Sequence, residues 1–331
     1  MKAVVLVGGF GTRLRPLTLT TPKNLLPVVH RPMVERVVAH LGEHGVTEAV
    51  LSLGYKPDTF IDAYPDGTCA DVRLTYAVED EPLDTAGAIR FAAGEAGIDE
   101  RFVVVNGDVL TDLDVTRLIR FHDASGGEAT ITLHEVDDPS RFGVVATDVA
   151  GRVEAFVEKP ERDDAPSSMI NAGTYVFEPS VLGRIDVGRP VSVERETFPA
   201  LVEAGALYAL DGGAYWIDAG TPETYLQANL DLLTDDDGSV HDAADVAESA
   251  HVERSVVAAD AVVSEEATLT EAVVLDGALV EPGARVHRSI VGPGAVIRRG
   301  AELLDLSVIG EGVEVEVDAR VRGERIPADA G

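Results

Sequence analysis

The residues best suited to chemistry lie near the start of the chain, in the stretch LVGGFGTRLRPLTLTTPKNLLPV. Gly8, Gly9 and Gly11 allow the backbone to turn sharply and to approach a ligand with its amides pointing inward. Arg13 and Lys23 add positive charge and donors that suit phosphate oxygens. Because the stretch follows an apolar run, it predicts a phosphate-binding loop at the end of a buried strand.

Two familiar phosphate loops fit this stretch poorly. The G-x(4)-G-K-[ST] spacing of a Walker loop is missing. The dinucleotide fingerprint starts well in GFGTRL but has Leu14 at the position of its third glycine, and it has no use for Arg13. The sequence therefore argues against a nicotinamide-dependent oxidoreductase.

Strand-like and helix-like segments alternate along the first 230 residues. Apolar runs predict buried strands at 3–7, 49–53, 72–78 and 102–105. Helical spacing of apolar residues predicts helices over 33–44 and 85–96. This rhythm predicts an α/β fold, a Rossmann-like and mostly parallel sheet with helices on both faces, whose ligands bind at the carboxyl ends of the strands.

The residue pattern of the chain changes after TDDDGSV at 234–240. Four stretches that start at 244, 261, 278 and 295 align with a period of 17 and then 18 residues. One register holds Val246, Val263, Val280 and Ile297, a second holds Val252, Leu269, Val286 and Leu303, and a third holds Ala250, Ala267, Ala284 and Ala301. Small apolar residues about every six positions predict stacked three-sided coils, as in a left-handed parallel β-helix. We expect two domains, 1–233 and 241–331.

The composition is strongly acidic. The formal charge is −31, from 58 acidic and 27 basic residues, and only four of the basic residues are lysines. Such a chain repels nucleic acid and anionic membranes. It also resembles proteins of salt-loving organisms, where high ionic strength screens self-repulsion within a few ångströms. Since lysine is scarce, a lysine inside a motif is better explained by a functional role than by mere solvation of the surface.

Cysteine content and hydropathy limit the cysteine chemistry and the cellular compartment that we expect for this protein. A single cysteine, Cys69, excludes an internal disulfide and a cysteine-based zinc site. The start of the chain lacks the pattern of a signal peptide, and no 18-residue apolar run is present. We therefore expect a cytoplasmic protein without membrane or nucleic-acid partners.

The opening stretch closely resembles the signature of the sugar-1-phosphate nucleotidylyltransferases. Further motifs recur in that family's order: EPLDTAGAI at 81–89, NGD at 106–108, FGVV at 142–145, EKP at 158–160, NAGTYVF at 171–177 and WIDAGTPETY at 216–225. The repeats also fit, because many family members carry a C-terminal β-helix. The resemblance implies an enzyme that condenses a nucleoside triphosphate with a sugar 1-phosphate to give an NDP-sugar and pyrophosphate. It also implies assembly into a homo-oligomer through the β-helix.

The resemblance implies roles for individual residues. Arg13, Lys23 and Lys159 would be catalytic, and Asp108 and Asp218 would hold Mg²⁺. The nucleotide would lie against Leu6, Gly8, Gly9, Gly11, Thr12, Asp84, Thr85, Gly107 and Asp108. The sugar phosphate would contact Gly143, Glu158, Lys159, Asn171 and Asp218. Tyr215 and Trp216 fit packing supports better than base-stacking platforms.

The motifs leave the identity of the nucleobase and of the sugar open. Val7, Phe10 and the PLxTAGA pattern resemble the GDP-mannose branch, whereas WIDAGTPETY is closer to the uridylyl and thymidylyl branches. We favour a GDP-mannose type, with a glucose-1-phosphate uridylyl- or thymidylyltransferase as the alternative. The family commonly has glycine where Asp84 stands, so a side chain there could reshape the base pocket. A catalytically silent assembly subunit is the rival from another class, and the presence of all five charged residues, Arg13, Lys23, Asp108, Lys159 and Asp218, argues against it.

Overall fold

The computed structural model describes residues 1–233 and 239–328, so the acidic stretch 234–238 lies outside the described residues. The chain forms two units. The first, here called the sheet unit, comprises Met1–Gly9 and Val34–Trp216. The second, here called the coil unit, comprises Phe10–Met33 and the described residues from Ile217 onward. Each unit is described by itself below.

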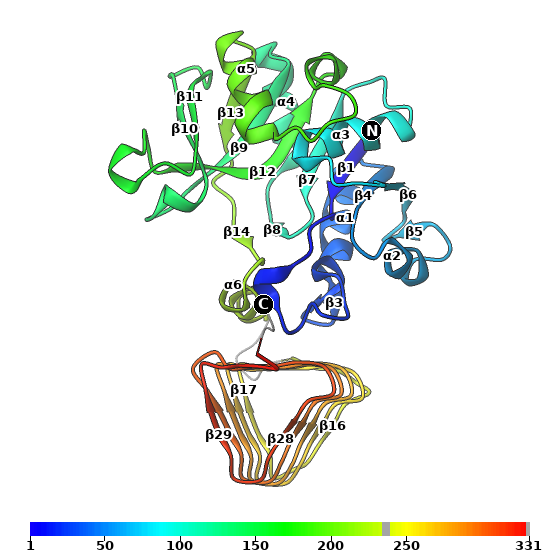
Figure 1. The fold of residues 1–331 in the computed structure, drawn as a ribbon, viewed down its shortest axis with the longest axis vertical. Coiled ribbons are helices and arrows are strands. Elements are labelled where there is room, and N and C mark those ends of the chain that lie inside the picture. The colour runs from blue at the N-terminus through cyan, green and yellow to red at the C-terminus, as the bar shows by residue number, and fades with distance from the viewer. Residues whose placement is uncertain (234–238, 329–331) are drawn as a thin grey trace. The chain divides into compact units, whose positions relative to one another are not determined.

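The sheet unit is built on a mixed sheet (Figure 1). Four strands are parallel and adjacent in the order β7-β1-β4-β6: Phe102–Asn106, Lys2–Leu6, Glu48–Leu53 and Val72–Val78. The remaining strands of this sheet are β5 (Thr68–Cys69), β9 (Ala129–Glu135), β10 (Gly143–Thr147), β11 (Val153–Glu158), β12 (Met169–Phe177) and β13 (Leu207–Asp211). The expected parallel order therefore holds for the first half, while β12 runs antiparallel to β7, β9 and β10, and β13 pairs parallel with β9.

Helices cover this sheet as the alternation predicts. They are α1 (Met33–Glu43), α2 (Pro57–Ala63), α3 (Asp84–Glu95), α4 (Val115–Ser125) and α5 (Phe198–Glu203). On one face Ala86 and Ile89 of α3 share a buried core with Val4 of β1. Val5 is also fully buried and, by the alternation of a strand, points to the opposite face. Burial on both faces explains why these strands read as continuous apolar runs.

The coil unit contains a stack of three-sided coils (Figure 1). One side is the parallel sheet of β15 (Ser239–Val240), β18 (Val256–Val257), β21 (Val273–Val274), β24 (Ile290–Val291), β27 (Val308–Ile309) and β30 (Arg325–Ile326). The second side is β16 (Asp245–Val246), β19 (Val262–Val263), β22 (Leu279–Val280), β25 (Val296–Ile297) and β28 (Glu314–Val315). The third is β17 (His251–Glu253), β20 (Thr268–Thr270), β23 (Arg285–His287), β26 (Glu302–Leu304) and β29 (Arg320–Arg322).

The predicted registers of the repeat are confirmed. Val246, Val263, Val280 and Ile297 are successive partners on one side, and Val252, Leu269, Val286 and Leu303 are partners on another. These side chains and the alanines between them form one buried apolar column. Strands β28 to β30 continue the stack beyond the four aligned stretches.

The same unit holds the segment 10–33 and the helix α6 (Pro222–Asp231). The segment contains the short strands β2 (Pro27–Val28) and β3 (Arg31–Pro32). Thr221 and Thr224 form a capping box at the start of α6. The Tyr225 hydroxyl donates to the Pro27 carbonyl at 2.5 Å, and the Val29 amide donates to Asn229 Oδ1 at 2.9 Å. The helix is thereby fastened to the segment that follows the glycine loop.

Two short strands complete the description, β8 (Val109–Thr111) and β14 (Trp216–Asp218). Within residues 1–233 and 239–328, none of the helices has the length and apolar character needed to cross a bilayer.

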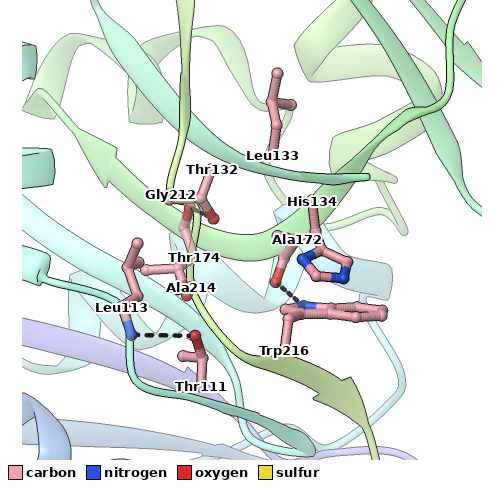
Figure 2. Close-up of a pocket in the computed structure, with 10 residues that line it drawn as sticks. All are labelled: Thr111, Leu113, Thr132, Leu133, His134, Ala172, Thr174, Gly212, Ala214 and Trp216. Atoms are coloured by element: carbon pink, nitrogen blue, oxygen red, sulfur yellow. Dashed lines mark hydrogen bonds between the residues drawn. The ribbon is translucent and has the colours of Figure 1, made fainter. Parts of the chain in front are cut away.

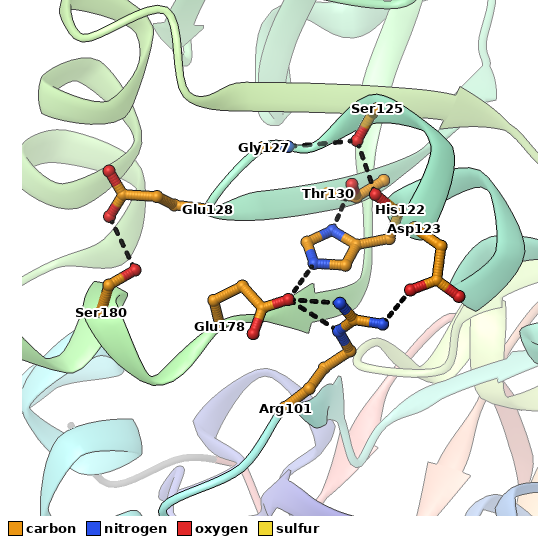
Figure 3. Close-up of polar contacts among 9 residues, drawn as sticks. All are labelled: Arg101, His122, Asp123, Ser125, Gly127, Glu128, Thr130, Glu178 and Ser180. Atoms are coloured by element: carbon orange, nitrogen blue, oxygen red, sulfur yellow. Dashed lines mark hydrogen bonds and ion pairs between the residues drawn. The ribbon is translucent and has the colours of Figure 1, made fainter.

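A buried histidine in the sheet unit is held by a polar cluster around Glu178 (Figure 3). His122 Nε2 lies 3.2 Å from Glu178 Oε1, and Nδ1 lies 2.8 Å from Thr130 Oγ1. A carboxylate only accepts, so Nε2 carries the proton and Nδ1 accepts from the threonine hydroxyl. Arg101 also donates to Glu178 and pairs with Asp123. Burial lowers the pKa of His122, with the Arg101 charge adding to the effect, although the Glu178 hydrogen bond opposes it.

This lowered pKa predicts a loss of stability in mild acid. Below about pH 6.5 the unfolded chain binds a proton at His122 that the folded protein binds only at lower pH, so the free energy of unfolding falls as pH drops through that window. Each unit of pKa difference is worth about 1.4 kcal/mol. Urea unfolding from pH 7.5 to 5 should show a shallower loss in His122→Asn than in the wild type. Identical slopes in both proteins would contradict this role.

Candidate functional site

The carboxyl ends of β1, β4 and β7 meet at one edge of the sheet, as expected. Leu6 pairs with Asn106 of β7 and with Ser52 of β4. The Gly107 amide donates to the Leu6 carbonyl at 2.9 Å. The end of the first strand and the NGD turn that carries Asp108 are therefore adjacent.

The antiparallel strand β12 brings a second motif to the same edge. Thr174 pairs with Val105, so the residues before it extend past the end of β7. Gly173 has φ +80°, and a Cβ there would lie 2.7 Å from the Asn106 side-chain nitrogen. This close approach requires glycine in NAGTYVF and places Asn171 near the NGD turn.

Asn171 is oriented from within the sheet unit. Its Nδ2 donates to the Tyr175 hydroxyl at 2.9 Å, and its Oδ1 accepts from the Gly173 amide at 3.3 Å. Burial raises the pKa of Tyr175, and the nearby carboxylates of Glu194, Glu158 and Asp108 raise it further, so the phenol stays neutral. A fixed amide with one remaining N–H suits recognition of a hydroxyl group.

Glu158 and Lys159 lie next to Asn171 along the same edge. Gly143 pairs with Glu158 on one side, and its neighbour Val144 pairs with Ile170 on the other. A Cβ on Gly143 would lie 2.6 Å from the Phe156 ring and 3.1 Å from Glu158 Oε2, so a side chain would displace both. The ammonium of Lys159 lies 3.2 Å from Glu158 Oε1. The strand register thus lines up the residues of three separate motifs.

The start of α3 holds Asp84 and Thr85. Asp84 has φ +58°, a left-handed conformation that glycine adopts without strain. Its Oδ1 accepts from the Thr85 amide at 2.7 Å, a local bond that helps an aspartate tolerate this conformation. Thr85 Oγ1 donates to Glu194 at 2.8 Å and accepts from the Val193 amide at 2.8 Å. The exposed Asp84 carboxylate therefore turns toward its own helix, and the backbone conformation would suit a glycine at this position.

The coil unit groups the other charged residues around the glycine loop. Gly11 has φ +63°, and its Cβ would lie 3.1 Å from Thr18 and 3.2 Å from Lys23 side-chain atoms. Arg13 lies in the 3-10 turn Thr12–Leu14, and its guanidinium lies 3.9 Å from Asp218 Oδ2. The loop thus presents Thr12, Arg13 and Lys23 close together in one unit.

Asp218 is fixed by a glycine two residues later. Its Oδ1 accepts from the Gly220 amide at 2.9 Å. A Cβ on Gly220 would lie 2.6 Å from that oxygen and 2.7 Å from the Arg13 Nη2 atom. Gly220 therefore allows the carboxylate and the guanidinium to approach each other.

Trp216 supports the sheet-edge residues, as the packing interpretation predicts. Its ring stacks on His134 with centroids 5.1 Å apart, and its Nε1 donates to the Ala172 carbonyl at 2.8 Å (Figure 2). The ring also packs edge-on against Phe142 at 5.8 Å. Ala172 follows Asn171, and Phe142 precedes Gly143. The indole therefore supports the chain next to both of these predicted sugar-binding residues.

Sequence reasoning missed several of these supporting residues. Glu79 accepts from the Leu83 amide and from Ser52, both at 3.0 Å, and so ties the segment before α3 to β4. Glu194 anchors Thr85, and Gly220 spaces Asp218. Glu194 lies 109 residues from Thr85, a separation at which spacing in a single sequence carries no signal.

These features define an α/β protein with a polar sheet edge and a glycine-arginine loop, joined to a parallel β-helix. Comparison with known families agrees. Residues 2–235 match the Nucleotidyl transferase family, and residues 235–329 match the GMPPB C-terminal domain. The chain therefore belongs to the nucleotidyl transferase family.

Similar proteins carry more specific names. Mannose-1-phosphate guanylyltransferase of Mycobacterium tuberculosis (strain ATCC 25618 / H37Rv) is 44% identical over 233 residues, which cover 70% of this chain and 64% of that protein. Mannose-1-phosphate guanylyltransferase 1 of Arabidopsis thaliana is 43% identical over 230 residues, or 68% of this chain and 63% of that protein. The chain thus spans just under two thirds of the length of these relatives.

Two solved structures are similar in fold. A putative glucose-1-phosphate thymidylyltransferase from Bacillus anthracis, in complex with a sucrose, has a TM-score of 0.63 and 28% identity, covering 69% of this chain and 94% of that one. HddC from Yersinia pseudotuberculosis, complexed with GMP-PN, has a TM-score of 0.58 and 31% identity, covering 69% and 97%.

The backbone at Asp84 gives a testable asymmetry. Asp84→Gly should leave the free energy of unfolding near that of the wild type, because glycine adopts the left-handed conformation freely. Asp84→Ala should lower it by roughly 1 kcal/mol, since alanine keeps the strain and loses the acceptor for the Thr85 amide. Urea unfolding measures both, with Asp163→Ala as an exposed control. Equal stability of the glycine and alanine variants would show that the conformation is unstrained.

Proposed function

We propose that the chain transfers a guanylyl group from GTP to mannose 1-phosphate, giving GDP-mannose and pyrophosphate. One observation carries the proposal: the strand register aligns Glu158, Gly143 and Asn171 with the NGD turn along one sheet edge. The choice of GTP and mannose rests on the names of the relatives that are 43–44% identical. The catalytic domain would be 1–233, with a β-helix domain from 241 to 331.

The chemistry explains why the candidate residues are cations and hydrogen-bond donors. An oxygen of the sugar phosphate attacks the α-phosphorus of the triphosphate, a new P–O bond forms, and the α–β bridge bond breaks with its electrons on pyrophosphate. The attacking group is already an anion, so no general base or nucleophilic side chain is needed. The barrier arises from bringing two polyanions together and from charge on the transition state.

Three cationic side chains would offset the negative charge of the phosphates. Arg13 would bind the β- and γ-phosphates and stabilise the departing pyrophosphate, and Lys23 would contact the α-phosphate region. Lys159 would bind the sugar phosphate, and its 3.2 Å contact with Glu158 would orient it before the substrate arrives. On a chain of net charge −31, each such cation offsets a repulsive background.

Backbone and amide groups would recognise the neutral parts. A Cβ on Gly8 would meet only Gly54 and Ser52 backbone atoms, at 3.5 Å and 3.6 Å, so the protein itself has room for a side chain there. The need for glycine at Gly8 would then come from a ligand lying against Leu6, Gly8, Gly9, Gly11 and Thr12. Asp84, Thr85 and Gly107 would complete the nucleotide site, and Gly143, Glu158 and Asn171 would hydrogen-bond sugar hydroxyls.

The donor set fits a hard divalent cation. Among the described residues no three histidine, cysteine or acidic side chains are grouped to hold a metal by themselves. Mg²⁺ commonly takes one or two carboxylates together with substrate phosphates and water, which matches Asp108 and Asp218. When bound, Mg²⁺ would neutralise phosphate charge in the ternary complex. We further propose that the protein is a cytoplasmic homo-oligomer assembled through the β-helix and adapted to high salt.

A glucose-1-phosphate thymidylyltransferase is the second candidate, favoured by the Bacillus anthracis structure and by the WIDAGTPETY motif. A screen of pyrophosphate release separates the candidates. It crosses five nucleoside triphosphates with glucose-, mannose-, galactose- and N-acetylglucosamine 1-phosphate at molar KCl, with and without Mg²⁺. GTP with mannose 1-phosphate should react fastest, and only with the metal present. Absence of release with every pair would overturn the enzymatic proposal.

The metal assignment predicts the behaviour of two isosteric variants. Asp108→Asn and Asp218→Asn should each lower kcat by about a hundredfold or more, because each removes one carboxylate charge from the ion site. Asp163→Asn, on the exposed 3-10 turn Arg162–Asp164, is the matched control and should keep the wild-type rate. Near-wild-type rates in both site variants, with unchanged unfolding midpoints, would show that the metal assignment is wrong.

A further inference from the structure

The last strand of the coil stack departs from the pattern of its neighbours. In the sheet of β15, β18, β21, β24, β27 and β30, one column consists of the first residue of each strand: Ser239, Val256, Val273, Ile290, Val308 and Arg325. From β18 onward, the second residue of each strand packs into the interior column of the stack. By strand alternation the first residues point outward. The four apolar members are nevertheless at most 2% exposed, so this side of the stack is covered.

Arg325 stands where an apolar residue would be expected, and it reaches the phosphate-binding loop. Its Nη1 donates to the Arg13 carbonyl at 3.0 Å and lies 3.4 Å from the Arg15 carbonyl. These acceptors are more than 300 residues earlier in the chain. One guanidinium thus spans the end of the 3-10 turn that carries the Arg13 side chain.

Two neighbouring contacts make this a continuous support. Thr20 Oγ1 donates to Glu311, on the coil before Arg325. A Cβ on Gly310 would lie 3.0 Å from Pro16 Cβ, so the Gly310 backbone packs closely against the Pro16 side chain. The last two coils therefore contact the loop at Arg13, Arg15, Pro16 and Thr20.

Hydrogen bonds within the loop are short-range, and Thr18 Oγ1 also donates to the Gly11 carbonyl at 2.7 Å. The Leu14 amide donates to Gly11 and the Arg15 amide donates to Thr12, which makes a turn of three residues. Turns of this kind have poor hydrogen-bond geometry and leave carbonyls at the end without partners inside the turn. The guanidinium of Arg325 supplies charged donors to two carbonyls at that end.

We propose that Arg325 is a positioning residue: it holds the backbone of Arg13 so that the Arg13 guanidinium is preorganised for the triphosphate. The kinetic part of this inference rests on the function proposed above, whereas the structural part does not. The C-terminal coil stack then contributes to turnover through this contact, in addition to any role in assembly.

The first test needs no activity. Hydrogen exchange followed by mass spectrometry on the full chain should show faster exchange of the amides at residues 14–19 in Arg325→Ala than in the wild type. Arg320→Ala is the matched control, since Arg320 lies on the same coil and pairs with Glu302 at 3.2 Å on the preceding coil. Equal exchange of this loop in the wild type and in Arg325→Ala would overturn the inference, whatever the enzyme does.

The second test is kinetic. Arg325→Ala should lower kcat/KM for the nucleotide about three- to tenfold, the effect of losing one or two hydrogen bonds, with an unchanged KM for the sugar phosphate. Arg325→Lys should restore part of the loss, and Arg320→Ala should match the wild type. Equal losses of kcat/KM toward both substrates would indicate a merely structural role and overturn the proposal. The same conclusion would follow if Arg320→Ala lowered the unfolding midpoint as much as Arg325→Ala does. A wild type inactive with every substrate pair would instead reject the proposed function and leave the exchange result standing.

Discussion

The register between β12 and the three strands that it pairs with, β7, β9 and β10, is the constraint on which the sheet-edge residues depend. Slipping a strand by one residue turns every side chain to the other face, and here it would also move Asn171 away from the end of β7. Gly173 makes the register possible, because its left-handed backbone absorbs the shift between Asn171 and Tyr175 where a side chain would collide with Asn106. The buried Tyr175 then fixes the Asn171 amide.

Charge imposes the second constraint. The chain carries an excess of 31 negative charges, and carboxylates lie near the sites proposed for phosphates. At molar salt the Debye length is about 3 Å, so distant charges are screened while direct contacts keep most of their effect. The contacts of Arg13 with Asp218 and of Lys159 with Glu158 operate at this range. Their effect therefore depends on local backbone geometry rather than on the overall field.

Much of the fold could be predicted because its signals are local. Continuous apolar runs gave the parallel strands β1, β4, β6 and β7, and the repeat period gave the coil registers to the residue. The antiparallel half of the sheet was not predicted, since no short-range pattern states which strand β12 will pair with. The candidate residues came from resemblance to a family. Their supports, such as Glu194, Trp216 and Arg325, act across about 40 to 310 residues and leave no trace in local spacing.

The letters of the repeats did not identify the covered side of the stack. The strands β18, β21, β24 and β27 read VV, VV, IV and VI, but β19, β22 and β25 on another side read VV, LV and VI. Burial separates the two sides, because the first residues of β18, β21, β24 and β27 are buried and those of β19, β22 and β25 are only half-buried. A strand that is buried on both faces is covered on both, and this cover appears only in the structure.

The change to Arg-Ile at 325–326 marks where that cover changes from apolar packing to backbone carbonyls. Alternating charges cross the last coils, with Glu302 between Arg285 and Arg320 and Arg298 between Glu281 and Glu314. Exposed pairs of this kind are individually weak, but they act together and at contact distance, where salt screens them least. The coil that contacts the glycine loop is thus itself held in part by ion pairs, and a chain with 58 acidic and 27 basic residues has carboxylates in excess to form them.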